Sequence, residues 1–105
     1  MRLKDSEIRS LRRALEPHLL GRPFRLYLFG SRVDNAKRGG DIDLLLEVET
    51  SLKGLLLDKK GRIKSDLGEA VGDQRVDLTI CAREDMEEDP FLNSVASDAV
   101  LLFRG

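Results

Sequence analysis

Hydrophobic and polar positions alternate along the chain with periods that divide it into short helices and strands. Between residues 5 and 19, apolar side chains recur every three or four positions, a spacing that predicts an amphipathic helix. Residues 24–29, 41–48 and 75–81 instead alternate apolar side chains with polar or aromatic ones, so three strands are predicted there. The apolar run at residues 100–103 predicts a fourth, short strand.

The segments between these strands differ in their helical signal. Residues 52–70 have apolar side chains roughly in phase with one helix, and Gly72 is a candidate stop after it. The acidic stretch at residues 84–89 predicts a loop. Pro90 is then expected to begin a last helix that reaches about residue 98.

The order of these elements predicts an α/β fold. We expect a single small domain over residues 1–105, with helices packed on a mixed β-sheet. Because a helix connects the second and third strands, those strands should be parallel neighbours in a right-handed crossover. Their first residues then lie at the same end of the sheet.

Composition narrows the class of protein. Hydrophobic residues make up 41% and charged residues 35%, which suits a soluble globular domain. Lys and Arg (18) nearly balance Asp and Glu (19), so no overall field attracts nucleic acid or a membrane surface. A lone cysteine, Cys81, and an N-terminus without the apolar stretch of a signal peptide predict a cytoplasmic location.

Three aspartates are predicted to gather at one end of the sheet. Asp41 and Asp43 share one face of their strand, with Cα atoms about 6.6 Å apart. Asp77 lies near the start of the next parallel strand, and so at the same end of the sheet as Asp41 and Asp43. Carboxylates crowded in this way suit Mg²⁺ or Mn²⁺. A D-x-D pattern also arises about once by chance in a chain of this length and Asp content, and each acid taken alone fits a turn or surface role equally well.

A glycine and a serine come before this acidic pair in the sequence, and a short basic loop separates the two motifs. Gly30 permits close approach of the backbone, and exposed amides with the Ser31 hydroxyl can donate hydrogen bonds to phosphate oxygens. Arg32 adds a positive charge beside them. The alternative is an ordinary turn followed by a solvated loop.

Taken together, these motifs resemble the minimal nucleotidyltransferases of the DNA-polymerase-β-like superfamily. The family signature is G-S, a loop of about ten residues and D-x-D, followed by a third acid on a strand, and the resemblance covers residues 24–81. The matching residues are Gly30, Ser31, Arg32, Asp41, Asp43 and Asp77.

The resemblance implies a metal-dependent enzyme that transfers a nucleotidyl group from ATP to a hydroxyl group. Asp41 and Asp43 would hold Mg²⁺ at the triphosphate, and Asp77 would complete a second metal position or act as the general base. Gly30, Ser31 and Arg32 would bind the phosphates.

The same resemblance implies a protein partner. Larger relatives carry a second domain that holds the acceptor, whereas stand-alone members are typically antitoxins that transfer AMP to a tyrosine of a HEPN-domain ribonuclease toxin. A hetero-oligomer is therefore expected, and neither a membrane nor nucleic acid is expected as a partner.

Two alternatives remain. The acceptor could be an RNA end or a small-molecule hydroxyl. The site could also be catalytically inert and serve only for binding, since the loop from Arg32 to Gly40 is one residue shorter than the family pattern and Asn35 stands near a usual glycine.

Overall fold

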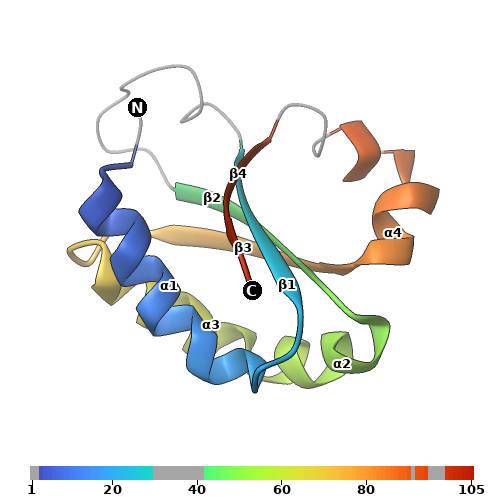
Figure 1. Cartoon of the computed structure of the whole chain (residues 1–105), viewed down its shortest axis with the longest axis horizontal. Coiled ribbons are helices and arrows are strands. Elements are labelled where there is room, and N and C mark those ends of the chain that lie inside the picture. Colours follow the sequence, from blue (N-terminus) through green and yellow to red (C-terminus); the bar gives the residue numbers. More distant parts are fainter. Residues whose placement is uncertain (1–2, 30–41, 91, 95–98) are drawn as a thin grey trace.

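The computed structural model describes residues 3–29, 42–90, 92–94 and 99–105, which contain both helices and strands. The chain runs through α1 (Asp5–Leu19), β1 (Phe24–Phe29), β2 (Ile42–Val48), α2 (Thr50–Asp58), α3 (Lys60–Ala70), β3 (Val76–Ala82), α4 (Arg83–Glu88) and β4 (Val100–Arg104) (Figure 1). The predicted α/β class is confirmed.

The four strands form one mixed sheet in the order β3-β2-β1-β4. β1 pairs antiparallel with both of its neighbours, while β2 and β3 are parallel. The parallel pairing predicted from the helical connection between β2 and β3 is therefore confirmed.

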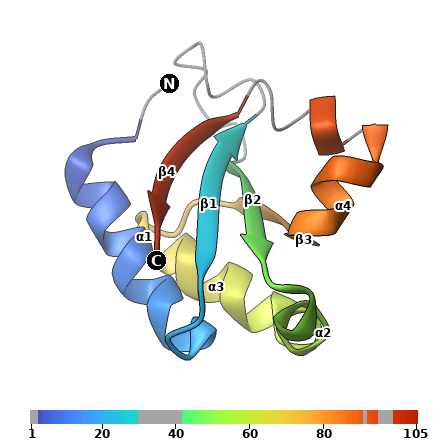
Figure 2. The ribbon, with the colours of Figure 1, turned by 45° about the vertical axis from the view of Figure 1, so that its right-hand side comes forward.

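One face of the sheet carries most of the core. Alternate residues of β1 and β2, such as Leu26 and Leu44, are fully buried against helix residues such as Leu15 and Leu67. The views in Figures 1 and 2 place α1, α2 and α3 along this face, and α4 at the far end of β3. The apolar stripe of the first helix and the alternation of the strands account for this layer.

The segment predicted as one helix over residues 52–70 is two helices, and this prediction is wrong in its boundaries. At Lys59 the backbone N–H bonds to the carbonyl of Leu56, three residues back, which closes α2 with a tight turn. The N–H of Ile63 then bonds to the carbonyl of Lys59, which begins α3. Leu56 and Ile63 are both buried, so the apolar phase continues across the break.

The acidic stretch at residues 84–89 is not a loop, because most of it forms α4. The carboxylate of Asp85 accepts a hydrogen bond from the backbone N–H of Ala82 at 3.0 Å and so caps the first turn. Beyond α4, Pro90 and residues 92–94 are helical, in agreement with the predicted last helix as far as the description extends.

Two glycines fix the turn that leads into β3. Gly72 has a φ of +78°, a left-handed conformation that glycine adopts without strain just after a helix. A Cβ atom on Gly68 would lie 2.8 Å from the carbonyl oxygen of Gln74, so α3 and the turn can approach closely only with glycine here. These contacts set where β3 begins.

Candidate active site

The face of the sheet opposite α1 and α3 carries the polar positions of three strands in register. Phe29 of β1 pairs with Asp43 of β2, and Asp43 pairs with Asp77 of β3. Two rows further along the strands, Arg25 pairs with Glu47, and Glu47 with Cys81. This face therefore has an acidic row at one end and a mixed row at the other.

Asp43 and Asp77 are register partners on neighbouring parallel strands. Partners in such a pair point to the same face, and their backbones are about 4.8 Å apart. Asp77 is exposed and Asp43 half-buried, so both are near the surface. The two carboxylates can therefore share a divalent cation, and without a cation or another positive group they repel.

The acidic row lies where β1 ends and where β2 and β3 begin. Phe29, the partner of Asp43, directly precedes Gly30 in the sequence. The backbone N–H of Ile42 donates to the carbonyl of Arg75 at 2.9 Å and fixes this end of the parallel pair. The four remaining residues of the predicted site lie outside the described residues: Gly30, Ser31, Arg32 and Asp41.

The described residues include two of the three predicted metal ligands, Asp43 and Asp77. Within residues 3–29, 42–90, 92–94 and 99–105, no group of three or more His, Cys, Asp or Glu side chains is arranged to hold a metal ion. The predicted set includes Asp41, which that description does not cover. Asp43 and Asp77 alone offer two carboxylates on one face, a donor set that suits Mg²⁺.

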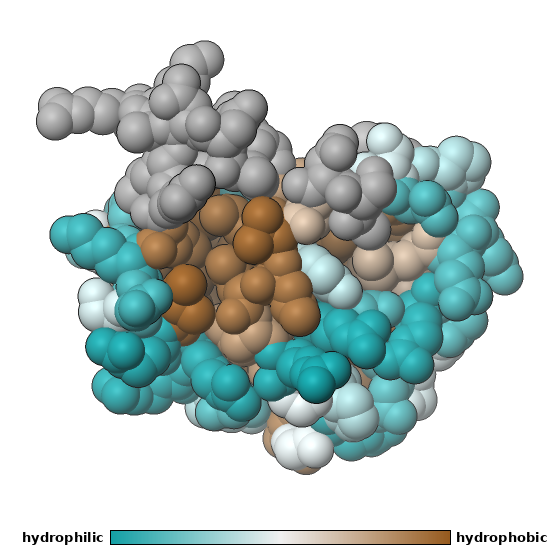
Figure 3. Space-filling view, turned by 45° about the horizontal axis from the view of Figure 1, so that its top comes forward, coloured by the Kyte–Doolittle hydropathy of each residue, from teal (hydrophilic) through white to brown (hydrophobic). Residues whose placement is uncertain are grey.

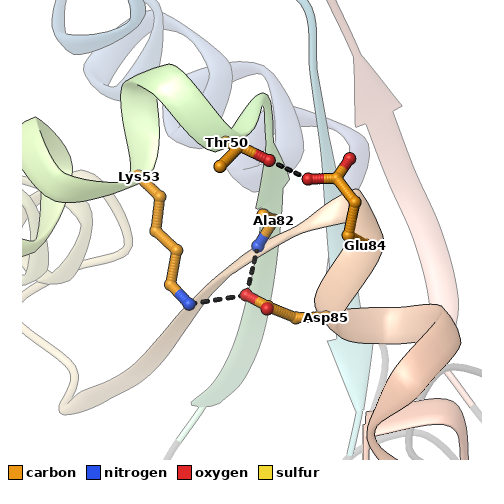
Figure 4. A network of polar contacts seen from close by, with 5 residues as sticks. All are labelled: Thr50, Lys53, Ala82, Glu84 and Asp85. Atoms are coloured by element: carbon orange, nitrogen blue, oxygen red, sulfur yellow. Dashed lines mark hydrogen bonds and ion pairs between the residues drawn. The ribbon is translucent and has the colours of Figure 1, made fainter.

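The opposite end of the sheet is fixed by a polar network between α2 and α4 (Figure 4). Lys53 reaches from α2 to Asp85, with 2.5 Å between Nζ and the carboxylate oxygen. Lys53 and the N–H of Ala82 lower the pKa of the Asp85 carboxyl. Thr50 donates a second hydrogen bond across the same gap, to Glu84. The network holds the start of α4 against the start of α2.

Burial raises the pKa values of two further groups on this face, Cys81 and Tyr27. Burial raises the pKa of the Cys81 thiol to about 12, and the negative charge of Glu47 adds to the shift. The pKa of Tyr27 is also raised, again by burial first and by Glu47 second. Both groups are therefore protonated near neutral pH, and neither is a ready nucleophile.

Two sequence comparisons found no match for this chain. It matches no protein-family model, and no curated protein matches it significantly. The part of the chain that the structure describes contains no helix long and apolar enough to cross a membrane.

Reasoning from the sequence alone assigned no role to Glu47. The alternation of β2 places Glu47 on the same face as Asp43, but only the structure reveals that it is buried beneath two arginines. The available signal was a glutamate inside an otherwise apolar strand, which is uncommon unless its charge is partnered.

Proposed function

We propose that this protein is a Mg²⁺-dependent nucleotidyltransferase that transfers AMP from ATP to a tyrosine of a HEPN-domain ribonuclease toxin and thereby acts as its antitoxin. The observation that carries the proposal is the register pairing of Asp43 with Asp77, at the end of the sheet where β1 runs toward Gly30. The choice of acceptor rests on the resemblance of the G-S and D-x-D motifs to stand-alone minimal nucleotidyltransferases. The proposal implies a cytoplasmic location, where ATP and such a toxin occur together.

Each residue has a distinct role in this reaction. Asp43 and Asp77, with Asp41, would hold Mg²⁺, which supplies positive charge to the triphosphate and acidifies the acceptor hydroxyl. The acceptor oxygen attacks the α-phosphorus, and the bond from that phosphorus to the pyrophosphate oxygen breaks. Asp77 accepts the hydroxyl proton, and because Asp77 is exposed it can pass that proton to water.

Exposed apolar surface supports a protein as the acceptor. On the edge strand β4, Val100 and Leu101 are 47% and 45% exposed. The face drawn in Figure 3 has a hydrophobic area bordered by hydrophilic residues. Apolar patches with a polar rim commonly mark contacts between proteins.

The experiment that tests the proposal is transfer of label from α-³²P-ATP. The protein is incubated with Mg²⁺ and with a HEPN-domain ribonuclease toxin as the candidate acceptor, and the label is followed on a gel. We expect label on the partner, and a loss of about 100-fold or more in rate for Asp43→Asn and Asp77→Asn. Asp58→Asn, an exposed carboxylate at the end of α2, is the matched control and should retain the wild-type rate.

The alternatives give different results in the same assay. Label on RNA or on a small molecule, with none on the protein partner, would replace the proposed acceptor. Toxin suppression without any label, unchanged in Asp43→Asn, would show an inert binding module. Either result would refute the proposed protein adenylyltransferase.

A further inference from the structure

A buried carboxylate lies at the end of the sheet opposite Asp43 and Asp77. The Glu47 side chain is only 7% exposed, and its Oε1 accepts no hydrogen bond from any described residue. Two arginines approach it, with Arg25 Nη1 3.6 Å from Oε1 and Arg83 Nε 3.6 Å from Oε2. Charge-assisted hydrogen bonds of this type are about 2.7–2.9 Å long, so both arginines neutralise Glu47 without satisfying it.

Glu47 lines a cleft of about 860 Å³, the size of a small-molecule site. Four arginines from four different elements also line this cleft: Arg12, Arg25, Arg83 and Arg104. A guanidinium presents several N–H donors in a planar fork that matches phosphate oxygens. The cleft therefore offers an anion more donors than the surrounding protein uses.

The other acids that line the cleft are already engaged. Glu49 accepts from Arg22 at 2.8 Å, and Glu84 accepts from Thr50. Among the described residues that line this cleft, Glu47 is thus the acid with a buried oxygen that has no hydrogen-bond donor. Leaving such an oxygen buried without a donor is costly, which favours a ligand that supplies one.

The position of the cleft fits a ligand site. It lies at the carboxyl ends of the parallel strands β2 and β3, and residues at the starts of α2 and α4 line it. Sheets with parallel strands commonly bind ligands beyond the carboxyl ends of those strands. The Lys53–Asp85 contact holds its two helical walls together.

We propose that this cleft is a second binding site, for a phosphate ester that also carries a hydroxyl group, the chemistry shared by sugar phosphates and ribonucleotides. The phosphate is bound by Arg25 and Arg83, and a hydroxyl of the ligand donates to the Glu47 carboxylate. An anion alone would leave the Glu47 oxygen unpaired, and a neutral sugar would leave the guanidinium donors unused. This inference does not depend on the proposed transferase activity.

The test is an NMR titration of the ¹⁵N-labelled protein with ribose 5-phosphate, in EDTA and without Mg²⁺. We expect amide shifts at the ends of β2 and β3, and binding at least about tenfold tighter than that of inorganic phosphate or of ribose, the value of one well-formed hydrogen bond to a charged group. Glu47→Gln should reduce this preference, because a neutral amide oxygen accepts a weaker hydrogen bond than a carboxylate. The same change should strengthen the binding of inorganic phosphate, because it removes a negative charge beside Arg25 and Arg83. AMP as a second probe distinguishes the sources, since tighter binding of AMP assigns a nucleotide and equal binding assigns the sugar phosphate.

Controls separate this site from the proposed active site. Arg83→Ala, at an exposed side chain at the start of α4, should weaken the binding of both ribose 5-phosphate and inorganic phosphate, whereas Arg62→Ala on the exposed surface of α3 should weaken neither. Asp77→Asn should retain ribose 5-phosphate binding even if it abolishes nucleotidyl transfer. Equal affinity for phosphate and ribose 5-phosphate, or shifts that map to Asp43 and Asp77 instead, would overturn the proposal.

Discussion

Asp77→Asn should stabilise the protein in the absence of divalent cations. The substitution keeps the size of the side chain and removes one of two like charges that face each other on neighbouring strands. Asp77 is the better choice of the two because it is exposed, so the new amide remains hydrated. The gain comes from lost repulsion, since like charges directly opposite each other destabilise a sheet.

The size of the gain follows from the strand spacing. Two unit charges about 5 Å apart repel by about 0.8 kcal/mol in water and by about 3 kcal/mol at an effective dielectric constant of 20. Because Asp77 is exposed and Asp43 is half-buried, the value should lie near the lower limit, about 1 kcal/mol. For a domain of this size, that free energy raises the melting temperature by about 4–8 °C.

The assay is thermal unfolding with EDTA and then with increasing Mg²⁺. The wild-type protein should gain about 1.4 kcal/mol when Mg²⁺ reaches ten times its dissociation constant, while Asp77→Asn should gain clearly less. Asp58→Asn should change the stability by less than about 0.5 kcal/mol in either buffer.

Two outcomes would contradict this account. A loss of stability in Asp77→Asn would mean that the carboxylate makes a favourable structural contact. An equal response of wild-type protein and variant to Mg²⁺ would mean that Asp77 is not a ligand. Either result would also weaken the proposed function, because that proposal depends on this pair.

Two further predictions concern the other end of the sheet. Contacts with Lys53 and Ala82 lower the pKa of Asp85 in the folded protein, so the ionised carboxylate stabilises the fold. This stabilisation is complete above the ordinary carboxyl pKa of 3.8 and is lost as pH falls through the lowered value. The difference in urea midpoint between wild type and Asp85→Asn should therefore shrink from pH 6 to pH 3. Cys81, with a pKa raised to about 12, should react with a disulfide reagent at pH 8 at least about a thousandfold more slowly in the native protein than in urea, and a fast native reaction would show that it is accessible.

The strands were predictable because each presents its apolar residues to one layer of helices. In β1, burial alternates at every residue, which is the pattern the sequence displays. β2 departs from this rule, since Leu45 and Glu47 on its second face are also buried. Burial on both faces depends on neighbours distant in sequence, so alternation alone could not predict it.

Helix ends were harder to predict for a related reason. Leu56 and Ile63 keep the same phase through the break at Lys59, so periodicity could not separate α2 from α3. α4 has no buried residue, and its first turn depends on the contacts of Asp85 with Ala82 and Lys53. A helix stabilised by polar contacts rather than by an apolar stripe carries no periodic signal.

The spacing of residues in the sequence predicted that Asp43 and Asp77 lie at one end of the sheet, but it did not predict the cleft lined by arginines. Asp43 and Asp77 come together because β2 and β3 are parallel, as the helical connection predicted, and because the two strands begin at the same level in the structure. The arginines of the cleft come from four elements, and the approach of Arg25 and Arg83 to Glu47 depends on the full tertiary fold. Only the first arrangement can be inferred from the order of strands and helices along the sequence.

The difference in burial between Asp43 and Glu47 agrees with the two different ligands that we propose for one face of β2. They are four residues apart, roughly 13 Å along the strand, a separation that allows both ends to be occupied at once. Near the surface, Asp43 with Asp77 favours a hydrated cation, because little desolvation is needed. Glu47 is enclosed and already neutralised by arginines, so it selects a hydroxyl donor instead. Exchanging the two environments, rather than the two side chains, would therefore exchange the ligands that the two carboxylates favour.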